Sequence, residues 1–293
     1  MIRKGIYALI LVIASGILFP AFAQPGLDTT WKRGGNMGIN LNQVSLSSWA
    51  AGGDNTVGLN LQFSYFADYK KLRHLLHNRL ELDYGLNKTK TDGTKKTNDK
   101  IYLSSIYGYE LRKHLYLSGL LTFQTQFAKG YDYNTDPRTY ISRFMSPGYL
   151  LLGAGLTWTI RPWFTATLTP ATWRGTFVTS KILSDEGQFG VSPGKHFFSE
   201  FGANLRMEAR YEFLKNMTIF SRLSFYSNYL KDPQNIDITW DVQLVMTINN
   251  WFATTLTTNM IYDNDTKITQ KDGTKGPRLQ FKEALSVGFN FTF

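Results

Sequence analysis

Apolar and polar residues alternate along many segments of this chain, most clearly between Ile236 and Ile248. The even positions of this segment are all apolar, whereas the odd positions include Asp237, Asp241 and Gln243. Successive side chains of a β-strand point to opposite faces of the sheet. The pattern therefore predicts a strand with one apolar face and one polar face.

The same alternation recurs from one end of the chain to the other and predicts about twelve strands. Most of these segments have 10 to 15 residues, which is longer than the usual strand of a soluble protein and suits a tilted strand that crosses a bilayer. An even number of such strands is typical of outer-membrane barrels. The weaker patterns lie at 37–44 and 164–177, and the stronger ones at 57–68, 76–87, 101–111, 115–127, 150–160, 201–213, 217–229, 236–248, 252–263 and 279–293.

The connections between these segments alternate in length. In outer-membrane barrels the short turns face the periplasm and the long loops face outward. With about twelve strands, both chain ends are then expected on the periplasmic side. Short turns are predicted at 69–73, 112–113, 161–162, 214–216 and 249–250, and longer polar segments at 46–55, 88–100, 129–147, 178–196, 231–235 and 263–277.

A soluble β-sandwich also has alternating strands, so it is the alternative fold. Aromatic residues flank the predicted short turns, among them Trp158, Trp163, Tyr211 and Trp251. Such residues are typical of the aromatic girdle at a membrane interface. We therefore expect an all-β fold, a single transmembrane, antiparallel, up-and-down β-barrel of about 12 strands in residues 34–293.

The last predicted strand ends in LSVGFNFTF, residues 285–293. Its odd positions, which include Phe289, Phe291 and Phe293, are expected to face lipid. An open sheet edge is not tolerated in hydrocarbon, so this strand is expected to pair with the first one, near 38–42. A terminal strand that ends in Phe also resembles the signal read by the outer-membrane assembly machinery, and we predict that role for these three residues.

The N-terminus has the features of a secretory signal peptide. Arg3 and Lys4 precede an apolar stretch, and an A-x-A pattern at 21–23 predicts cleavage before Gln24. We expect a signal peptide at 1–23, a short periplasmic segment at 24–33, and an outer-membrane location for the mature chain. Removing the two basic residues lowers the formal net charge from +10 to +8. The sequence has no cysteine, so it has neither disulfides nor thiolate metal sites.

Long stretches of the chain resemble a family of outer-membrane β-barrels of unknown function from Bacteroidota-type bacteria. The resemblance implies an outer-membrane barrel and no particular activity. It rests on WKRGGNMGINLNQVSLSSWAAGGDN (31–55), YGLNKTKTDGTKKTNDKIYLSSIYGYEL (84–111), FQTQFAKGYDY (123–133), FYSNYLKDPQNIDITWDV (225–242) and GPRLQFKEALSVGFNFTF (276–293).

Several predicted strands carry charges on the face that would point into the barrel. Isolated charges are costly to bury, so these side chains are expected to pair or to contact water. The predicted lumen cluster consists of Arg79, Glu81, Asp83, Arg206, Glu208, Arg210, Arg222 and Asp241.

Two interpretations of this cluster stay open: a lumen plugged by salt bridges, or a narrow polar channel that passes or binds a small solute. Eight-stranded barrels are filled by side chains, whereas sixteen-stranded ones leave a wide channel. A barrel of about twelve strands lies between these sizes, so the number of strands does not decide between the two interpretations. Glycines at inward positions leave space that larger side chains, including Trp173 and Tyr226, are expected to fill.

The sequence offers no convincing catalytic site. GVSPG at 190–194 matches G-x-S-x-G, but the residue after the serine is Pro193, which has no N–H for an oxyanion hole. The histidines His74, His77, His114 and His196 fall at turns, in a loop or on the inner face, not beside a serine on the lipid face. We expect no enzyme activity, no cofactor and no bound metal.

Polar loops are the other candidate contact surfaces. Lysine-rich stretches at 88–100 and 267–275 are expected to lie against lipopolysaccharide phosphates. They lack interleaved aromatics, so nucleic-acid binding is not expected. Trp49 either folds into the barrel mouth or contacts a partner protein of the envelope. Pro170 cannot donate to a strand ladder, which predicts a bulge or a break there.

Overall fold

The computed structural model of the chain describes residues 30–44, 56–89, 93–133, 135–264, 267–269 and 275–293. The expected signal peptide and Trp49 lie outside these described residues. Residues Lys32–Phe293 form one compact unit, which holds the β-barrel.

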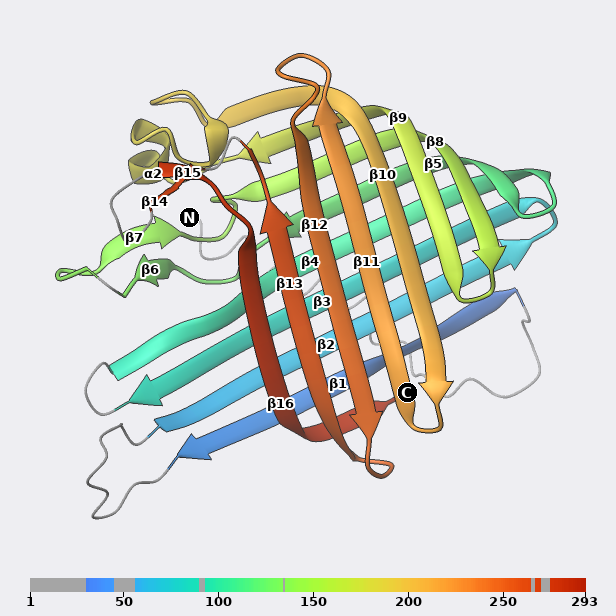
Figure 1. The fold of residues 1–293 in the computed structure, drawn as a ribbon, viewed down its shortest axis with the longest axis horizontal. Helices are drawn as coiled ribbons and strands as arrows, with labels where there is room; N and C mark the ends of the chain where they lie inside the picture. The colour runs from blue at the N-terminus through green and yellow to red at the C-terminus, as the bar shows by residue number, and fades with distance from the viewer. Residues whose placement is uncertain (1–29, 45–55, 90–92, 134, 265–266, 270–274) are drawn as a thin grey trace, which may run out of the picture. The chain divides into compact units, whose positions relative to one another are not determined.

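Twelve long strands of the described residues correspond one to one to the predicted segments. They are β1 (Trp31–Val44), β2 (Thr56–Lys71), β3 (His74–Thr89), β4 (Gly93–Arg112), β5 (Leu115–Thr125), β8 (Gly148–Arg161), β9 (Phe164–Phe177), β10 (Phe197–Leu214), β11 (Met217–Asn228), β12 (Ile236–Thr247), β13 (Phe252–Tyr262) and β16 (Gln280–Thr292). They close into one barrel in the order β1-β16-β13-β12-β11-β10-β9-β8-β5-β4-β3-β2 (Figure 1). The expected all-β, up-and-down fold is confirmed.

The first and last strands close the barrel wall, as the sequence predicted. Their register runs from Asn36 opposite Thr292 to Asn40 opposite Gly288. Next to the pair of Asn36 and Thr292, the backbones of Gly35 and Phe293 exchange two hydrogen bonds, of 2.8 and 3.0 Å. The last residue is therefore part of the closed wall.

The two ends of the barrel differ in their connections. One end has short turns, such as 72–73 between β2 and β3 and 113–114 between β4 and β5. The other end carries short extra elements, which are β6 (Gly130–Asp132), β7 (Thr139–Ser142), helix α2 (Lys181–Asp185), 3-10 helix η1 (Gln188–Gly190), β14 (Lys267–Thr269) and β15 (Lys275–Pro277).

The prediction of a long loop at 88–100 is wrong for most of these residues. β3 and β4 stay paired as far as Thr89 opposite Gly93, so only 90–92 separate the two strands. Threonine has a high strand propensity, and Gly93 adopts a positive φ of 71° that glycine tolerates. Several lysines of this stretch, including Lys100, therefore lie on a strand.

Side chains alternate between the lumen and the outer face, as β4 illustrates. Tyr102 and Ile106 are only 7% and 3% exposed, whereas Leu103 and Tyr107, on the opposite face, are 39% and 47% exposed. Large apolar residues in a continuous outer belt require an apolar environment. Separately, no helix in the described part of the chain is long and apolar enough to cross a membrane.

Pro170 interrupts β9, and the interruption is a β-bulge. The register shifts between Ala154 and Leu156 on the β8 side and between Gly202 and Asn204 on the β10 side. Proline has no N–H for a neighbouring strand, so an unpaired extra residue is accommodated at this position. The sequence predicted a bulge or a break, and the structure has the bulge.

The bulge reverses which side chains of β9 face the lumen. Thr169 before it and Thr172 after it are both completely buried, and the Thr172 hydroxyl donates to the Thr169 carbonyl at 2.6 Å. Trp173 therefore faces outward, and the expectation that it fills the lumen is wrong. The same reversal turns Arg174 into the lumen.

Candidate functional site

The barrel brings Arg222 and Glu81 into direct contact across its lumen. Arg222 lies midway along β11 and Glu81 midway along β3, and these strands are six positions apart in the closed order of twelve. Arg222 donates from Nη1 to Glu81 Oε1 at 2.8 Å and from Nη2 to Oε2 at 3.2 Å. Two opposite walls are thus joined by one ion pair.

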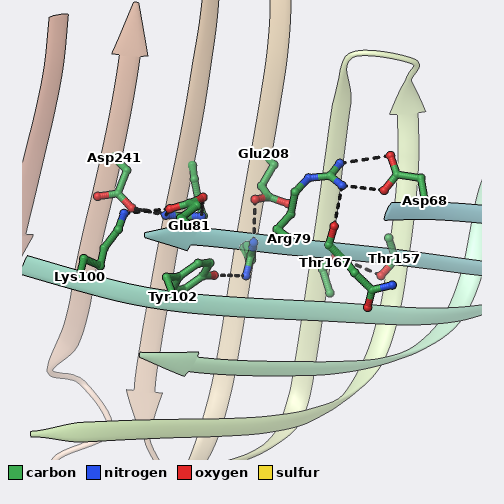
Figure 2. Close-up of polar contacts among 12 residues, drawn as sticks. Asp68, Arg79, Glu81, Lys100, Tyr102, Thr157, Thr167, Glu208 and Asp241 are labelled. Atoms are coloured by element: carbon green, nitrogen blue, oxygen red, sulfur yellow. Dashed lines mark hydrogen bonds and ion pairs between the residues drawn. The ribbon is translucent and has the colours of Figure 1, made fainter. Parts of the chain in front are cut away.

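Neighbouring charges extend this contact on both walls. Arg222 also donates to Asp241 of β12 at 2.8 Å, and Asn259 donates to the other oxygen of Asp241 at 2.8 Å. On the opposite wall, Lys100 lies 2.8 Å from Glu81 and 3.4 Å from Asp83. Figure 2 shows Glu81, Lys100 and Asp241 converging from their separate strands.

A second arginine joins the same level of the barrel. Arg206 of β10 donates to Glu208 and to the Tyr102 hydroxyl, each at 2.7 Å. The Tyr102 ring also lies 4.3 Å from the Arg222 guanidinium, a distance at which a cation–π contact is favourable. We call the set the mid-height cluster; its members are Glu81, Asp83, Lys100, Tyr102, Arg206, Glu208, Arg222 and Asp241.

The arginines of the mid-height cluster are deeply buried. Arg206 is 3% and Arg222 is 5% exposed. An unpaired charge at such a position would carry a large desolvation cost, so charge-assisted bonds to carboxylates are what allow it. The buried arginines of the mid-height cluster are therefore paired, which is one of the two outcomes that the sequence predicts for inward charges.

A separate ion-pair layer lies nearer the long-loop end. Arg174 of β9 makes two bonds of 2.6 Å to Glu200 and one of 2.8 Å to Asp237. Its guanidinium lies 4.0 Å from the centre of the Tyr226 ring. Asn228 donates to Glu200 at 3.1 Å.

Two predicted cluster residues lie elsewhere. Arg79 pairs with Asp68 near the short-turn end, at 2.6 Å, and His77 lies 3.0 Å from the same carboxylate. Figure 2 shows the Arg79–Asp68 pair apart from Glu81. Arg210 is exposed and has no ion pair within the described residues. The other six predicted residues lie together in the mid-height cluster.

Sequence reasoning missed three contributors. Lys100 lies in a lysine-rich stretch that lacks apolar alternation, so the pattern predicts a loop there and not a strand. Tyr102 was overlooked because its role depends on cations from other strands. Arg174 was missed because the bulge at Pro170 reverses the inward positions; the proline itself was the only available signal.

The remaining chemical candidates occupy unremarkable positions. His74 bonds to the Tyr107 hydroxyl at 2.7 Å, and His196 lies 2.7 Å from the Val178 carbonyl. Ser192 lies exposed in a turn after η1 rather than at a strand-to-helix elbow. Within the described residues there is no group of three or more His, Asp or Glu side chains that could hold a metal ion.

A closed antiparallel barrel with an apolar outer belt and a polar interior defines the class of transmembrane β-barrels. Residues 41–131 match the family described as "Protein of unknown function (DUF3078)". The expected resemblance to a domain-of-unknown-function family is confirmed over that segment, and its bacterial distribution stays a prediction. None of the curated proteins matches the chain.

Solved structures with a similar chain path include three outer-membrane barrels. The translocator domain of the autotransporter NalP from Neisseria meningitidis shares 10% identity, with 99% of this chain and 96% of that chain covered, at a TM-score of 0.39. An outer membrane channel from Pseudomonas putida F1 shares 10% identity, with 94% and 100% covered, at 0.40. The β domain of the Bordetella autotransporter BrkA shares 10%, with 90% and 100% covered, at 0.33.

Proposed function

We propose that the protein is an outer-membrane β-barrel whose own ion pairs close its lumen, and that it serves the envelope as a structural or accessory barrel rather than as an open pore. The observation that carries this proposal is the 2.8 Å contact between Arg222 and Glu81 across the lumen. A solute that passes mid-height has to displace at least one of these buried charges from its partner.

The energetics favour a stable closure. Removing one partner of a buried ion pair leaves the other uncompensated, which costs roughly 3–5 kcal/mol. Arg222 has two carboxylate partners, Glu81 and Asp241, and Glu81 has two cationic partners, Arg222 and Lys100. Opening the lumen therefore requires several contacts to break together.

Conductance in planar bilayers tests the proposal. The wild-type barrel is expected to give no steady ion current, whereas a Glu81→Ser/Arg222→Ser double variant is expected to conduct. Arg210→Ser is the matched control, because it removes an inner-face arginine that has no ion pair among the described residues. A steady wild-type current would contradict the closed-barrel proposal.

A narrow polar channel is the second candidate, and one observation favours it. The carboxylates of Glu81, Glu208 and Asp241 keep side-chain exposures of 20%, 22% and 22%. Water therefore reaches one side of the mid-height cluster. If the barrel is a channel, the wild-type protein is expected to conduct ions, and a charge reversal such as Arg222→Glu is expected to change the ion selectivity.

The envelope location and the partners belong to the same proposal. An accessory barrel is expected to contact outer-membrane lipid and lipopolysaccharide, to be inserted by the outer-membrane assembly machinery, and to co-purify with an envelope protein. Fractionation of the two membranes, followed by affinity purification after mild crosslinking, tests these points. Recovery in the inner membrane would contradict the location.

A further inference from the structure

A groove runs along the outer face of the barrel over β4, β5, β8 and β9. It is a shallow groove that is open to the surroundings rather than an enclosed cavity, with a volume of about 480 Å³. Its lining is almost entirely apolar and includes Tyr107, Gly119, Leu152, Ala154 and Trp173. The groove faces away from the lumen and is separate from the mid-height cluster.

Strand register produces the floor of this groove. Gly119 of β5 lies opposite Tyr107 on one side and Ala154 on the other, and Ala154 lies opposite Ala171 of β9. Three consecutive strands thus place their smallest outward side chains in one row. A methyl group added at Gly119 would meet no atom within 4 Å, so the space above the row is open.

Large apolar side chains form the walls on both sides of the floor. One wall consists of Leu121, Leu152, Trp173 and Phe201, which lie opposite one another on consecutive strands. The other consists of Leu117, Leu156 and Leu168, which are paired in the same way. A row of small residues between two rows of large ones forms a linear channel about as wide as a hydrocarbon chain, since rows on one strand face lie roughly 7 Å apart.

Trp173 is held in position as part of the wall. Its indole N–H donates to the Ser199 hydroxyl at 2.8 Å, and its ring centre lies 6.2 Å from that of Phe197. It faces outward only because of the bulge at Pro170. The groove is therefore formed by the folded barrel and not by mobile side chains.

Basic residues cluster at the short-turn end, below the groove. Arg112 and Lys113 lie at the β4–β5 turn and Arg161 lies at the end of β8, and all three are exposed. Leu115, at the start of β5, is four residues from Gly119, a separation of about 13 Å along a strand. Leu117 of the second wall lies between these cations and the floor, so a lipid with its phosphate at the interface has to lay its chain along β5, over the Leu117 row, to reach the floor.

We propose that this groove binds one acyl chain of an anionic phospholipid from the periplasmic leaflet, with the phosphate held by Arg112, Lys113 and Arg161. The inference rests on the outer-membrane placement proposed above. A second copy of the barrel fits less well. Barrel strands are tilted by about 35–45° from the barrel axis, so a groove that runs across them is tilted as well. Two such grooves related by a two-fold axis along the membrane normal would cross instead of lying parallel.

Lipid titration monitored by native mass spectrometry tests the proposal. The folded, detergent-solubilised full barrel is titrated with dioleoyl phosphatidylglycerol and, in parallel, with dioleoyl phosphatidylcholine. Wild-type protein is expected to retain one phosphatidylglycerol in preference to phosphatidylcholine. Ala154→Leu and Gly119→Leu fill the floor and are expected to weaken that binding about tenfold, as loss of about two buried methylene contacts does.

Two further variants make the result specific. Ala209→Leu adds the same side chain at an outward position of β10 away from the groove, and it is expected to bind lipid as wild type does. Arg112→Gln/Lys113→Gln is expected to abolish the preference for phosphatidylglycerol. Binding of phosphatidylcholine, which carries the same phosphate but no net charge, is expected to weaken less. Heat-modifiable migration in gels confirms that each variant is folded.

Three outcomes would overturn the proposal: unchanged lipid binding by folded Ala154→Leu, no preference between the two lipids in wild type, or a stable homodimer that Ala154→Leu dissociates. A wild-type barrel that binds the lipid but conducts ions would contradict only the closed-lumen function. A folded barrel that fails to enter lipid bilayers would contradict both.

Discussion

The Arg222 guanidinium lies 2.8 Å from the Glu81 carboxylate, although 141 residues separate them along the chain. The pair joins β11 to β3 through the interior of the barrel instead of along its wall. Backbone hydrogen bonds already connect each strand to its neighbours, so this side-chain contact adds a constraint of a different kind. It fixes the distance between two walls that no ladder joins.

Glu81→Gln is expected to destabilise the barrel by about 3 kcal/mol, because Arg222 and Lys100 both lose a buried carboxylate. The measurement is the free energy of unfolding from urea titration in lipid vesicles. Glu212→Gln on β10 is the control: Glu212 is exposed near the short-turn end and has no ion pair within the described residues, so a change within about 0.5 kcal/mol is expected. Equal losses in both variants would contradict the importance of the crossing pair.

A double-mutant cycle should show that Arg222 and Glu81 are coupled. The loss for Glu81→Gln/Arg222→Gln is expected to fall short of the sum of the single losses by about 1–3 kcal/mol, since one interaction is removed in both. The same urea titration gives the free energies of unfolding of the wild type, the two single variants and the double variant. Strict additivity would mean that the two side chains do not interact in the folded state.

Two glycine substitutions should differ in their effect on folding. At Gly202 an added methyl group would lie 1.9 Å from the Ser227 carbonyl oxygen, whereas at Gly119 it would meet nothing within 4 Å. Gly202→Ala is expected to cost about 1–3 kcal/mol, because the backbone of β10 has to move away from β11. Gly119→Ala is expected to be close to neutral. The thermal transition of the heat-modifiable gel band, followed for both variants, checks the contrast.

The hydroxyl of Thr172 is expected to stabilise the bulge. It donates to both the carbonyl and the hydroxyl of Thr169, at 2.6 and 2.7 Å. Thr172→Val keeps the shape and leaves these groups without their donor, so a loss of about 1–2 kcal/mol is expected. Thr172→Ser keeps the hydroxyl and should lose less in the same urea titration. A serine variant weaker than the valine variant would indicate that the methyl group, not the hydrogen bond, matters.

Deletion of Phe293 is expected to reduce assembly in cells more than stability in vitro. Phe289, Phe291 and Phe293 all lie outward, at 43%, 45% and 53% exposure, where assembly machinery can contact them. Deleting the last residue removes the two Gly35 bonds and the stacking of Phe293 on Phe63, with ring centres 6.2 Å apart, and leaves the five pairs of β1 with β16 in place. The measurements are folded barrel in cell envelopes and the yield of refolding into vesicles. Equal losses in both assays would contradict the predicted signal.

Local alternation was sufficient to predict the barrel. Each strand buries one face and exposes the other, and that pattern depends only on neighbours two residues away. It located even the weak strands at 37–44 and 164–177. It failed at 88–100, where both faces of the hairpin are polar and the period-two signal disappears although β3 and β4 are paired.

The internal ion pairs were only partly predictable. Alternation assigned Glu81, Arg206, Arg222 and Asp241 to the inner face, but not which of them meet. Partner choice depends on the closed order of strands and on how far opposite walls approach, and neither is encoded in a single strand. Arg174 shows a further limit, because one extra residue reverses every inward position that follows it.

The bulge at Pro170 also affects how this strand can change in evolution. Below it, the inward threonines occupy odd positions, and above it, Thr172 and Arg174 occupy even ones. Loss of a single codon at 170 or 171 would remove the extra residue and leave a regular strand, in which Thr172 and Arg174 still face the lumen and Trp173 still faces outward. At the bulge, the strand can therefore change its length by one residue without exchanging its two faces.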